Sequence, residues 1–183
     1  DEYTKEYCLN ASGLVSSYTD PDGASQTFTY TADGTLARLE YRDPSYPDEN
    51  STSTLTWQDG NIVSISTIDG RDNETTTFSY TEHLNPWNGI DIGAFMIGDA
   101  EESAMLLGIS GTTVKNLPAS RRDGSSATTY TYTFDAEGRV STIVIEENWQ
   151  DGGGSGSERT EYTLHYGPQT VSKPDNNPNQ TKP

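Results

Sequence analysis

Apart from carboxylates, few side chains of this chain are suited to acid–base or nucleophilic chemistry. It has two histidines, His83 and His165, and one cysteine, Cys8, beside 28 acidic residues. A Ser–His–Asp triad needs a histidine beside an activated serine, and the sequence contains no G-x-S-x-G nucleophile elbow. The histidines and the cysteine also lack the close spacing of zinc ligands. The sequence therefore predicts neither a hydrolase triad nor a zinc site.

Carboxylates are numerous, but no pair of them stands out as catalytic. A glycosidase needs two carboxyl groups on either side of a cleft, whereas the adjacent glutamates at 101–102 and 146–147 would face opposite ways on a strand. Oxygen ligands for calcium gather in loops 20–23 and 69–74. Neither loop has the spacing of a D-x-[DN]-x-[DN]-G site, so solvated turns are favoured and calcium binding stays open. We expect no metal, no cofactor and no enzymatic activity.

Aromatic residues are the best candidates for binding, since the chain has 3 Trp and 11 Tyr. Most of them alternate with Thr, which predicts that they form the buried face of a sheet. Trp87 and Trp149 are different, because Trp87 lies in an Asn/Pro/Gly loop and Trp149 precedes a Gly-rich run at 151–157. Exposed rings there would stack on a sugar; the alternative is that each ring docks back into the core.

Four copies of one hairpin pattern must position these residues, at 6–18, 27–41, 53–65 and 130–146. Each copy has an alternating aromatic/Thr strand, a tight turn that ends in Gly and an aliphatic return strand. The turn glycines occupy the place where φ is positive; they are Gly13, Gly34, Gly60 and Gly138. The polar residues expected to cap these turns are Asn10, Asp33, Asp59 and Asp135. Apolar residues fall at +2 and +5 after Gly, which predicts a β-bulge early in the return strand.

The rest of the chain interrupts or extends this repeat. Residues 1–167 are expected to form a single β domain, with a helical insertion at about 90–108 that packs against the sheet. If that insertion were instead a lid over an apolar ligand, a cavity would remain beside Phe95, Met96 and Met105. Pro118 should begin an edge strand. The Gly-rich run at 151–157 should be a flexible hairpin loop, and 168–183 a Pro/Asn-rich tail.

Composition limits the partners and the location. The formal net charge of the 183 residues is -17, which repels nucleic acid and disfavours anionic membranes. No apolar run is long enough to span a bilayer as a helix. The chain begins at Asp1 rather than Met, so we expect an export signal, and with it any lipid anchor, to have been removed. Cys8 excludes an internal disulfide and is expected to be a small buried hydrophobe.

The hairpin copies resemble a known family. The copy that runs from Tyr132 through Asp135, Gly138 and Arg139 to Ile143 is similar to a YD repeat of RHS-type secreted shells. The whole pattern, with Leu106-Leu-Gly108 and Lys115-Asn-Leu-Pro118 at and after the end of the insertion, resembles a secreted or lipoprotein family of unknown function from Bacteroidetes. That resemblance covers most of residues 6–167. It implies a porin-like, strongly curved sheet and a lipoprotein or periplasmic location, and it carries over no catalytic residue.

These observations predict an all-β fold: a curved antiparallel meander of about ten strands, a half-open or closed porin-like barrel built from repeated hairpins. The leading functional hypothesis is a non-enzymatic binding or scaffold module, exported to the periplasm, outer membrane or cell surface. One alternative is an extracellular carbohydrate-binding protein, or a weak glycosidase, that uses Trp87 and Trp149. The other is a carrier for an apolar small molecule. The partner is expected to be a glycan or a protein.

Overall fold

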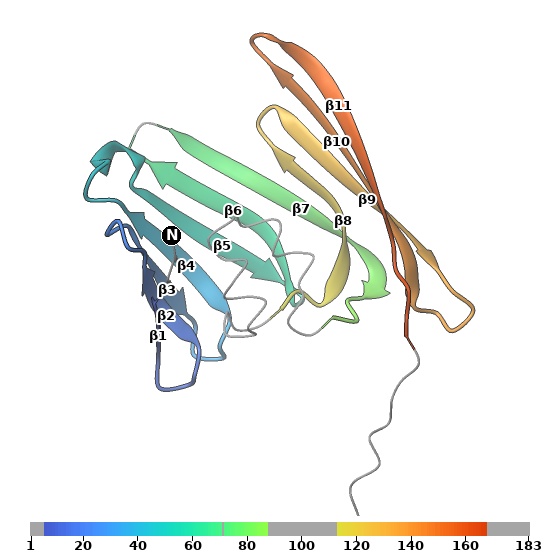
Figure 1. The fold of residues 1–183 in the computed structure, drawn as a ribbon, viewed down its shortest axis with the longest axis horizontal. Coiled ribbons are helices and arrows are strands. Elements are labelled where there is room, and N and C mark those ends of the chain that lie inside the picture. The colour runs from blue at the N-terminus through green and yellow to red at the C-terminus, as the bar shows by residue number, and fades with distance from the viewer. Residues whose placement is uncertain (1–5, 71, 88–112, 168–183) are drawn as a thin grey trace, which may run out of the picture.

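A computed structural model describes residues 6–70, 72–87 and 113–167. They form one antiparallel sheet of 11 strands, in which the spatial order follows the chain from β1 to β11 (Figure 1). The strands are β1 (Glu6–Leu9), β2 (Val15–Thr19), β3 (Ser25–Tyr30), β4 (Leu36–Arg42), β5 (Ser51–Gln58), β6 (Asn61–Asp69), β7 (Asn73–Leu84), β8 (Asn116–Asp123), β9 (Ser126–Phe134), β10 (Val140–Asp151) and β11 (Gly154–Thr163). A short 3-10 helix, η1 (Pro47–Glu49), precedes β5.

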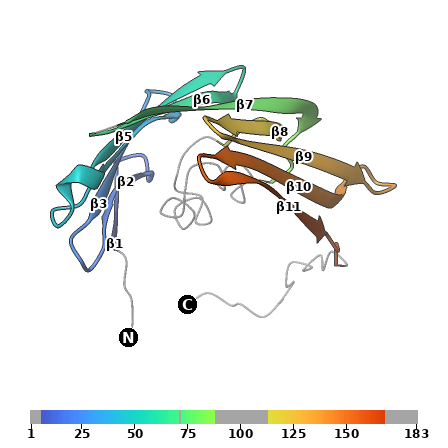
Figure 2. The ribbon, with the colours of Figure 1, turned by 90° about the horizontal axis from the view of Figure 1, so that it is seen from above.

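The sheet is curved into an arch with β1 and β11 at its two ends (Figure 2). It is open, because among the described residues β1 pairs only with β2 and β11 only with β10. The predicted antiparallel meander is confirmed, but it has eleven strands rather than about ten and does not close into a barrel. Strand twist accumulates across a sheet of this width, which explains why it curves. No helix in the described part of the chain is long and apolar enough to cross a membrane.

The repeated pattern corresponds to hairpins β1–β2, β3–β4, β5–β6 and β9–β10. The four turn glycines all have positive φ, between 77° and 83°. The register shifts by one residue early in each return strand, as a bulge requires. The side chains at +2 and +5 after Gly are buried in every copy; they are Val15, Tyr18, Leu36, Leu39, Ile62, Ile65, Val140 and Ile143. The bulge therefore keeps both positions on the inner face despite their odd spacing.

The predicted turn caps Asn10 and Asp135 are confirmed. The side-chain oxygens of Asn10 and Asp135 each accept hydrogen bonds from two backbone N–H groups of their own turn, at 2.8–3.1 Å. In the second copy Asp33 shares this role with Thr31. The Thr31 hydroxyl occupies the equivalent position and accepts the Thr35 N–H, while the Asp33 carboxylate accepts the Thr31 hydroxyl and also bonds to the Thr35 backbone. Asp59 does not cap its turn: with φ of 52° it is the first residue of a tight two-residue turn.

The core lies on the inner face of the sheet and combines aromatic and aliphatic side chains from both halves. Besides the repeat positions it contains Leu55, Phe78, Val114, Leu117 and Tyr130. Tyrosines and tryptophans at the next inward-facing positions of the strands are half-buried and pack against this core. The predicted aromatic buried face is therefore confirmed, and each strand turns its Thr and Ser residues mainly outward.

Pro118 does not begin an edge strand as expected. It lies inside β8, between β7 and β9, and is opposite Tyr80. The β7–β8 register shifts on both sides of Tyr80. An irregular stretch of the ladder can hold a residue that has no N–H to donate, so proline is accommodated in the interior of the sheet.

Two further expectations are corrected. Cys8 is exposed rather than buried, because it alternates with Tyr7, which takes the inward position on this edge strand and stacks near Tyr18. The Gly-rich run is mostly strand, since β11 begins at Gly154 and only Gly152 and Gly153 form the turn. The expected insertion at 90–108, with Phe95, Met96 and Met105, and the tail at 168–183 lie outside the described residues.

Candidate functional site

Trp87 follows β7 and is held by a short polar network. The backbone N–H of Asn85 donates to the carbonyl oxygen of Lys115 at 2.9 Å, and the Asn85 amide donates to that of Val114 at 3.2 Å. The Asn85 side-chain oxygen accepts the Trp87 N–H at 3.1 Å. These bonds place the indole against the core, where it is half-buried. Trp87 is therefore neither a freely exposed ring nor a fully buried one.

A pocket of about 390 Å³ opens beside Trp87. Its walls come from the end of β7 and the residues after it, from the β9–β10 turn, and from the segment that follows β11. The lining residues are Leu84, Pro86, Trp87, Phe134, Gly138, Arg139, Val140, Tyr166 and Gly167. Three aromatic rings and one guanidinium thus meet at one place, although they are far apart in the sequence.

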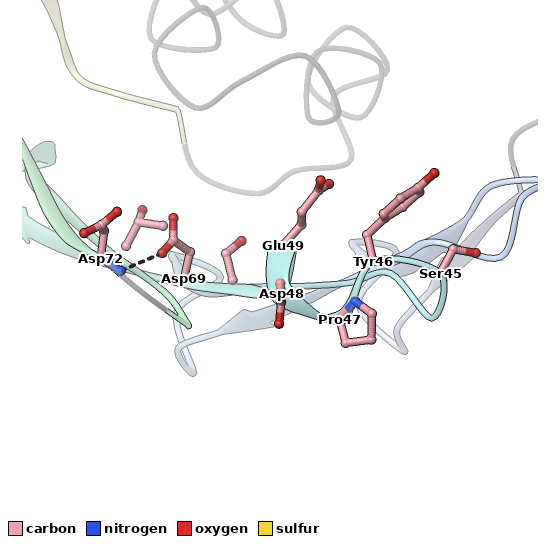
Figure 3. A pocket seen from close by; sticks show the side chains of 9 residues that line it. Ser45, Tyr46, Pro47, Asp48, Glu49, Asp69 and Asp72 are labelled. Carbon is pink, nitrogen blue, oxygen red and sulfur yellow. Dashed lines mark hydrogen bonds between the residues drawn. The ribbon is translucent and has the colours of Figure 1, made fainter.

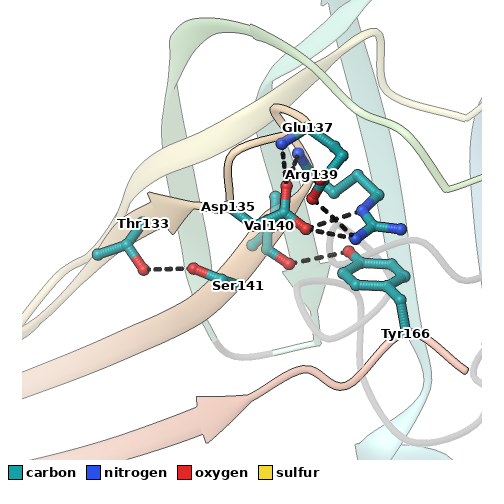
Figure 4. Close-up of polar contacts among 7 residues, drawn as sticks. All are labelled: Thr133, Asp135, Glu137, Arg139, Val140, Ser141 and Tyr166. Carbon is teal, nitrogen blue, oxygen red and sulfur yellow. Dashed lines mark hydrogen bonds and ion pairs between the residues drawn. The ribbon is translucent and has the colours of Figure 1, made fainter.

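Arg139 is the charged group of this pocket (Figure 4). Its guanidinium forms an ion pair with the Asp135 carboxylate at 2.7 Å and reaches Glu137 at 3.2 Å. It also lies 4.4 Å from the centroid of the Tyr166 ring, a cation–π geometry. The Tyr166 hydroxyl donates to the carbonyl oxygen of Val140 at 2.8 Å. Arg139 is therefore held in one orientation by its partners on two sides.

The ion pair also sets the charge state of both partners. Partial desolvation acts to raise the pKa of Asp135, but hydrogen bonds from the Arg139 backbone and guanidinium outweigh it, so the pKa is lowered overall. The hydrogen bond to Asp135 raises the pKa of Arg139 in turn. Both groups therefore stay charged at neutral pH. His83 is exposed, and its ring contacts that of Phe134 in a tilted arrangement with the ring centroids 4.4 Å apart.

Trp149 lies within β10 rather than before a loop. It pairs with Ser126 on β9 and with Gly156 on β11, and 38% of its surface is exposed. A groove of about 630 Å³ runs along this end of the sheet. It is lined by Arg122, Gly124, Ser125, Ser126, Ala127, Asn148, Trp149, Gln150, Ser155, Gly156 and Ser157.

The two tryptophans do not form one site. Val140, at the start of β10, lines the Trp87 pocket, whereas Trp149 lies toward the end of the same strand. At about 3.3 Å per residue, these two positions are about 30 Å apart along β10. Strand β10 therefore connects an aromatic pocket at one end with a polar groove at the other.

A third hollow, of about 670 Å³, is lined in part by acidic side chains (Figure 3). Its lining includes Asp48 and Glu49 of η1, and Asp69 and Asp72 of the β6–β7 turn. The carboxylate of Asp69 accepts the Asp72 N–H at 2.8 Å, so it closes that turn. In the other candidate calcium loop, Asp20 likewise accepts two backbone N–H groups. Within the described ranges, no three His, Cys, Asp or Glu side chains are grouped to hold a metal ion.

Sequence reasoning identified Trp87 but missed the other residues of its pocket. Phe134 and Arg139 belong to the clearest hairpin repeat, and Tyr166 follows the last strand. The spacing of Asp135 and Arg139 across a tight turn was a usable signal for their ion pair. Nothing local in the sequence indicates that Tyr166 joins them, because that contact depends on the register of β10 with β11.

Comparison with solved structures shows the same fold. A porin-like protein from Bacteroides uniformis ATCC 8492 superposes with a TM-score of 0.67 and 19% identity, over 87% of this chain and 68% of that chain. One from Bacteroides vulgatus ATCC 8482 superposes with a TM-score of 0.50 and 14% identity, over 91% and 74%. No curated protein sequence matches this chain. At these identities the likeness concerns the fold alone.

The sequence also matches a family model, described as a domain of unknown function (DUF4595) with porin-like fold, over residues 1–142. The resemblance to a porin-like family, expected from the hairpin copies, is thereby confirmed. Because the match covers more than half of the 183 residues, this chain belongs to the DUF4595 family of porin-like fold.

Proposed function

We propose that this chain is a non-enzymatic binding module of the bacterial envelope and that the Trp87 pocket is its binding site. The observation that carries the proposal is the convergence of Trp87, Phe134, Tyr166 and Arg139 on one pocket of about 390 Å³. Ligand pockets are typically concave and mostly apolar, with a few fixed polar groups and volumes of roughly 300–1,000 Å³. This pocket matches that description.

The guanidinium of Arg139 is held in an orientation that suits ligand binding. Its Nε and Nη2 groups bond to Asp135 and Glu137, while its Nη1 group has no partner among the described residues. Figure 4 shows that nitrogen directed away from the two carboxylates. A ligand acceptor would therefore meet donors that are already oriented, which lowers the entropy cost of binding. The rings of Trp87 and Tyr166 would contact an apolar part of the same ligand.

The charge state of the pocket favours binding over catalysis. A general acid needs a pKa near the working pH, commonly raised by burial. Asp135, which forms an ion pair with the pocket residue Arg139, has a lowered pKa because Arg139 bonds to it. It stays ionised at neutral pH and acts as an anchor for Arg139.

A place in the bacterial envelope, periplasmic or at the cell surface, is part of the proposal. It is supported by the net charge of -17, which favours solubility in a crowded compartment. Fractionation of cells that carry the native gene, followed by detection of the protein in each fraction, tests it. Recovery in the cytoplasmic fraction alone would contradict it.

The binding site is tested by a thermal-shift screen against soluble glycans, fatty acids and Ca²⁺. A ligand that binds only the folded state at 100 times its Kd adds about 2.7 kcal/mol of stability. We expect at least one ligand to give a saturable shift that is lost in Trp87→Ala and kept in Trp149→Ala, the matched control at the other end of β10. If every observed shift survives Trp87→Ala, the Trp87 pocket is not a binding site. No shift in any class would favour a scaffold that binds protein partners.

A further inference from the structure

We infer that the groove around Trp149 is a second binding site and that it takes a neutral oligosaccharide. This site is separate from the Trp87 pocket, so it goes beyond the function proposed above and can be tested independently of it. The inference depends on three features of the groove: the way in which the indole is held, the polar groups that line the groove, and a described lining without acidic side chains.

The indole of Trp149 lies directly over the backbone of Gly156. The two residues are opposite each other on β10 and β11. A Cβ built on Gly156 would lie 2.6 Å from Cε2 of the indole, 3.0 Å from Nε1 and closer still to Cζ2. Only glycine leaves room for the ring in this position. The side of the ring that faces β11 is therefore occupied, which leaves the opposite side as the source of the 38% exposure.

An indole held in this way provides a flat apolar platform. An exposed tryptophan on a strand leaves a large apolar area in water, which a ligand with an apolar face would cover. The pyranose ring of a sugar has such a face, formed by its C–H groups, and carries hydroxyl groups around its edge. The Nε1–H of Trp149 has no acceptor in the described part of the chain, so it remains available to a hydroxyl.

The side chains around the platform suit the hydroxyl groups of a sugar. Ser126 of β9 is opposite Trp149 and shares its face of the sheet. Asn148 and Gln150, next to Trp149 on β10, point to the other face; together with three further serines they line the same groove. Amides and hydroxyls both donate and accept hydrogen bonds, as sugar hydroxyls do. Their position is set by pairing, because Asn148 is opposite Ala127 of β9 and Ser157 of β11. The strands therefore hold one hydroxyl, that of Ser126, on the face of the indole, and the other donors and acceptors at a fixed spacing across this end of the sheet.

The charge of the groove indicates that the sugar is neutral. Among its described lining residues there is no acidic side chain and a single cation, Arg122, although the chain carries 28 acidic residues. The acidic hollow shows the contrast, since four of its lining residues are carboxylates. A net charge of -17 disfavours an anionic glycan over the whole surface. A neutral oligosaccharide is free of that repulsion and matches a groove whose described lining is mostly uncharged.

Affinity electrophoresis and tryptophan fluorescence titration with four neutral polysaccharides test the inference: xylan, galactomannan, dextran and mixed-linkage β-glucan. We expect at least one to retard the wild-type protein and to change its fluorescence. Trp149→Ala should weaken that binding by roughly tenfold or more. Gly156→Ala keeps the indole but displaces it, so it should weaken binding as well.

Gly154→Ala is the matched control, because a Cβ there meets nothing within 4 Å. It should bind as the wild type does. Trp87→Ala should also keep glycan binding, which distinguishes this site from the Trp87 pocket, and a Trp149→Tyr variant should retain part of the affinity. Circular dichroism checks that each variant is folded. The inference is overturned if none of the four polysaccharides binds, or if binding survives both Trp149→Ala and Gly156→Ala. An equal loss in Gly154→Ala would overturn it as well.

Discussion

The guanidinium of Arg139 stacks on the ring of Tyr166, with its central carbon 4.4 Å from the ring centroid. This contact joins the β9–β10 turn to the segment that follows β11. The Tyr166 hydroxyl strengthens the connection through its bond to the carbonyl oxygen of Val140 at 2.8 Å. One wall of the Trp87 pocket therefore depends on a side chain beyond the last strand.

Substitution of Tyr166 should separate the two parts of this contact. Tyr166→Phe removes only the hydrogen bond to Val140 and should lower the free energy of unfolding by about 0.5–1.5 kcal/mol. Tyr166→Ala also removes the stacking on Arg139, so its loss should be larger, by about 0.5–1 kcal/mol for an exposed cation–π contact. Urea unfolding measures both. Equal losses in the two variants would show that the ring contributes nothing to stability.

Acid should destabilise the protein partly through Asp135. The folded-state pKa of Asp135 lies below its ordinary value of 3.8, so its contribution is present above that value and is lost as the pH falls below it. Asp135→Asn keeps an oxygen for the backbone N–H groups of the turn but removes the charge. We expect the melting temperature of the wild type to fall more steeply than that of the variant below about pH 4. Parallel curves would contradict this role.

Gly138 should be difficult to replace because its φ is 77°. A Cβ there meets nothing within 4 Å, so any loss comes from the left-handed backbone and not from a clash. Gly138→Ala should cost about 1 kcal/mol, and Gly138→Asn less, since Asn tolerates this conformation. Gly154→Ala, where φ is not in the left-handed region, is the control and should cost nothing. Chemical denaturation compares the three, and a neutral Gly138→Ala would refute the argument.

Two leucines allow a matched test of the core. Leu117 on β8 is 0% exposed, whereas Leu9 on β1 is 53% exposed. Leu117→Ala should cost about 2–5 kcal/mol because it leaves a cavity among packed side chains, and Leu9→Ala should change stability by less than about 0.5 kcal/mol. Guanidinium unfolding gives both values. A similar cost for the two would mean that the core is centred elsewhere.

The local parts of the fold were predictable because their causes lie within a few residues. A glycine in a tight turn adopts positive φ wherever that turn occurs, and the +2 and +5 spacing of apolar residues after Gly138 requires a bulge in any antiparallel hairpin. The turn caps were less predictable where the details of the turn decide them. Thr31 and Asp33 share the capping of one turn, and Asp59 does not cap because its turn has only two residues.

The candidate sites were predictable only in part. Trp87 and Trp149 are unusual in the sequence, but their surroundings depend on neighbours that pairing brings together. The position of Trp149 over Gly156 follows from the β10–β11 register, which a turn at 152–153 implies and a longer flexible loop does not. Because a flexible loop was expected there, the contact between Trp149 and Gly156 was not predicted.

The sequence by itself determined the all-β class, the four repeated hairpins with their turn glycines and the family, because these depend on periodicity and on short-range backbone preferences. Only the tertiary structure decided which strands are interior, that the sheet stays open, and which side chains meet at each end of β10. These outcomes depend on strand order and register, which sum many weak contacts between residues far apart in the chain. The Trp87 pocket shows the difference, since its walls come from three segments that are adjacent only after folding.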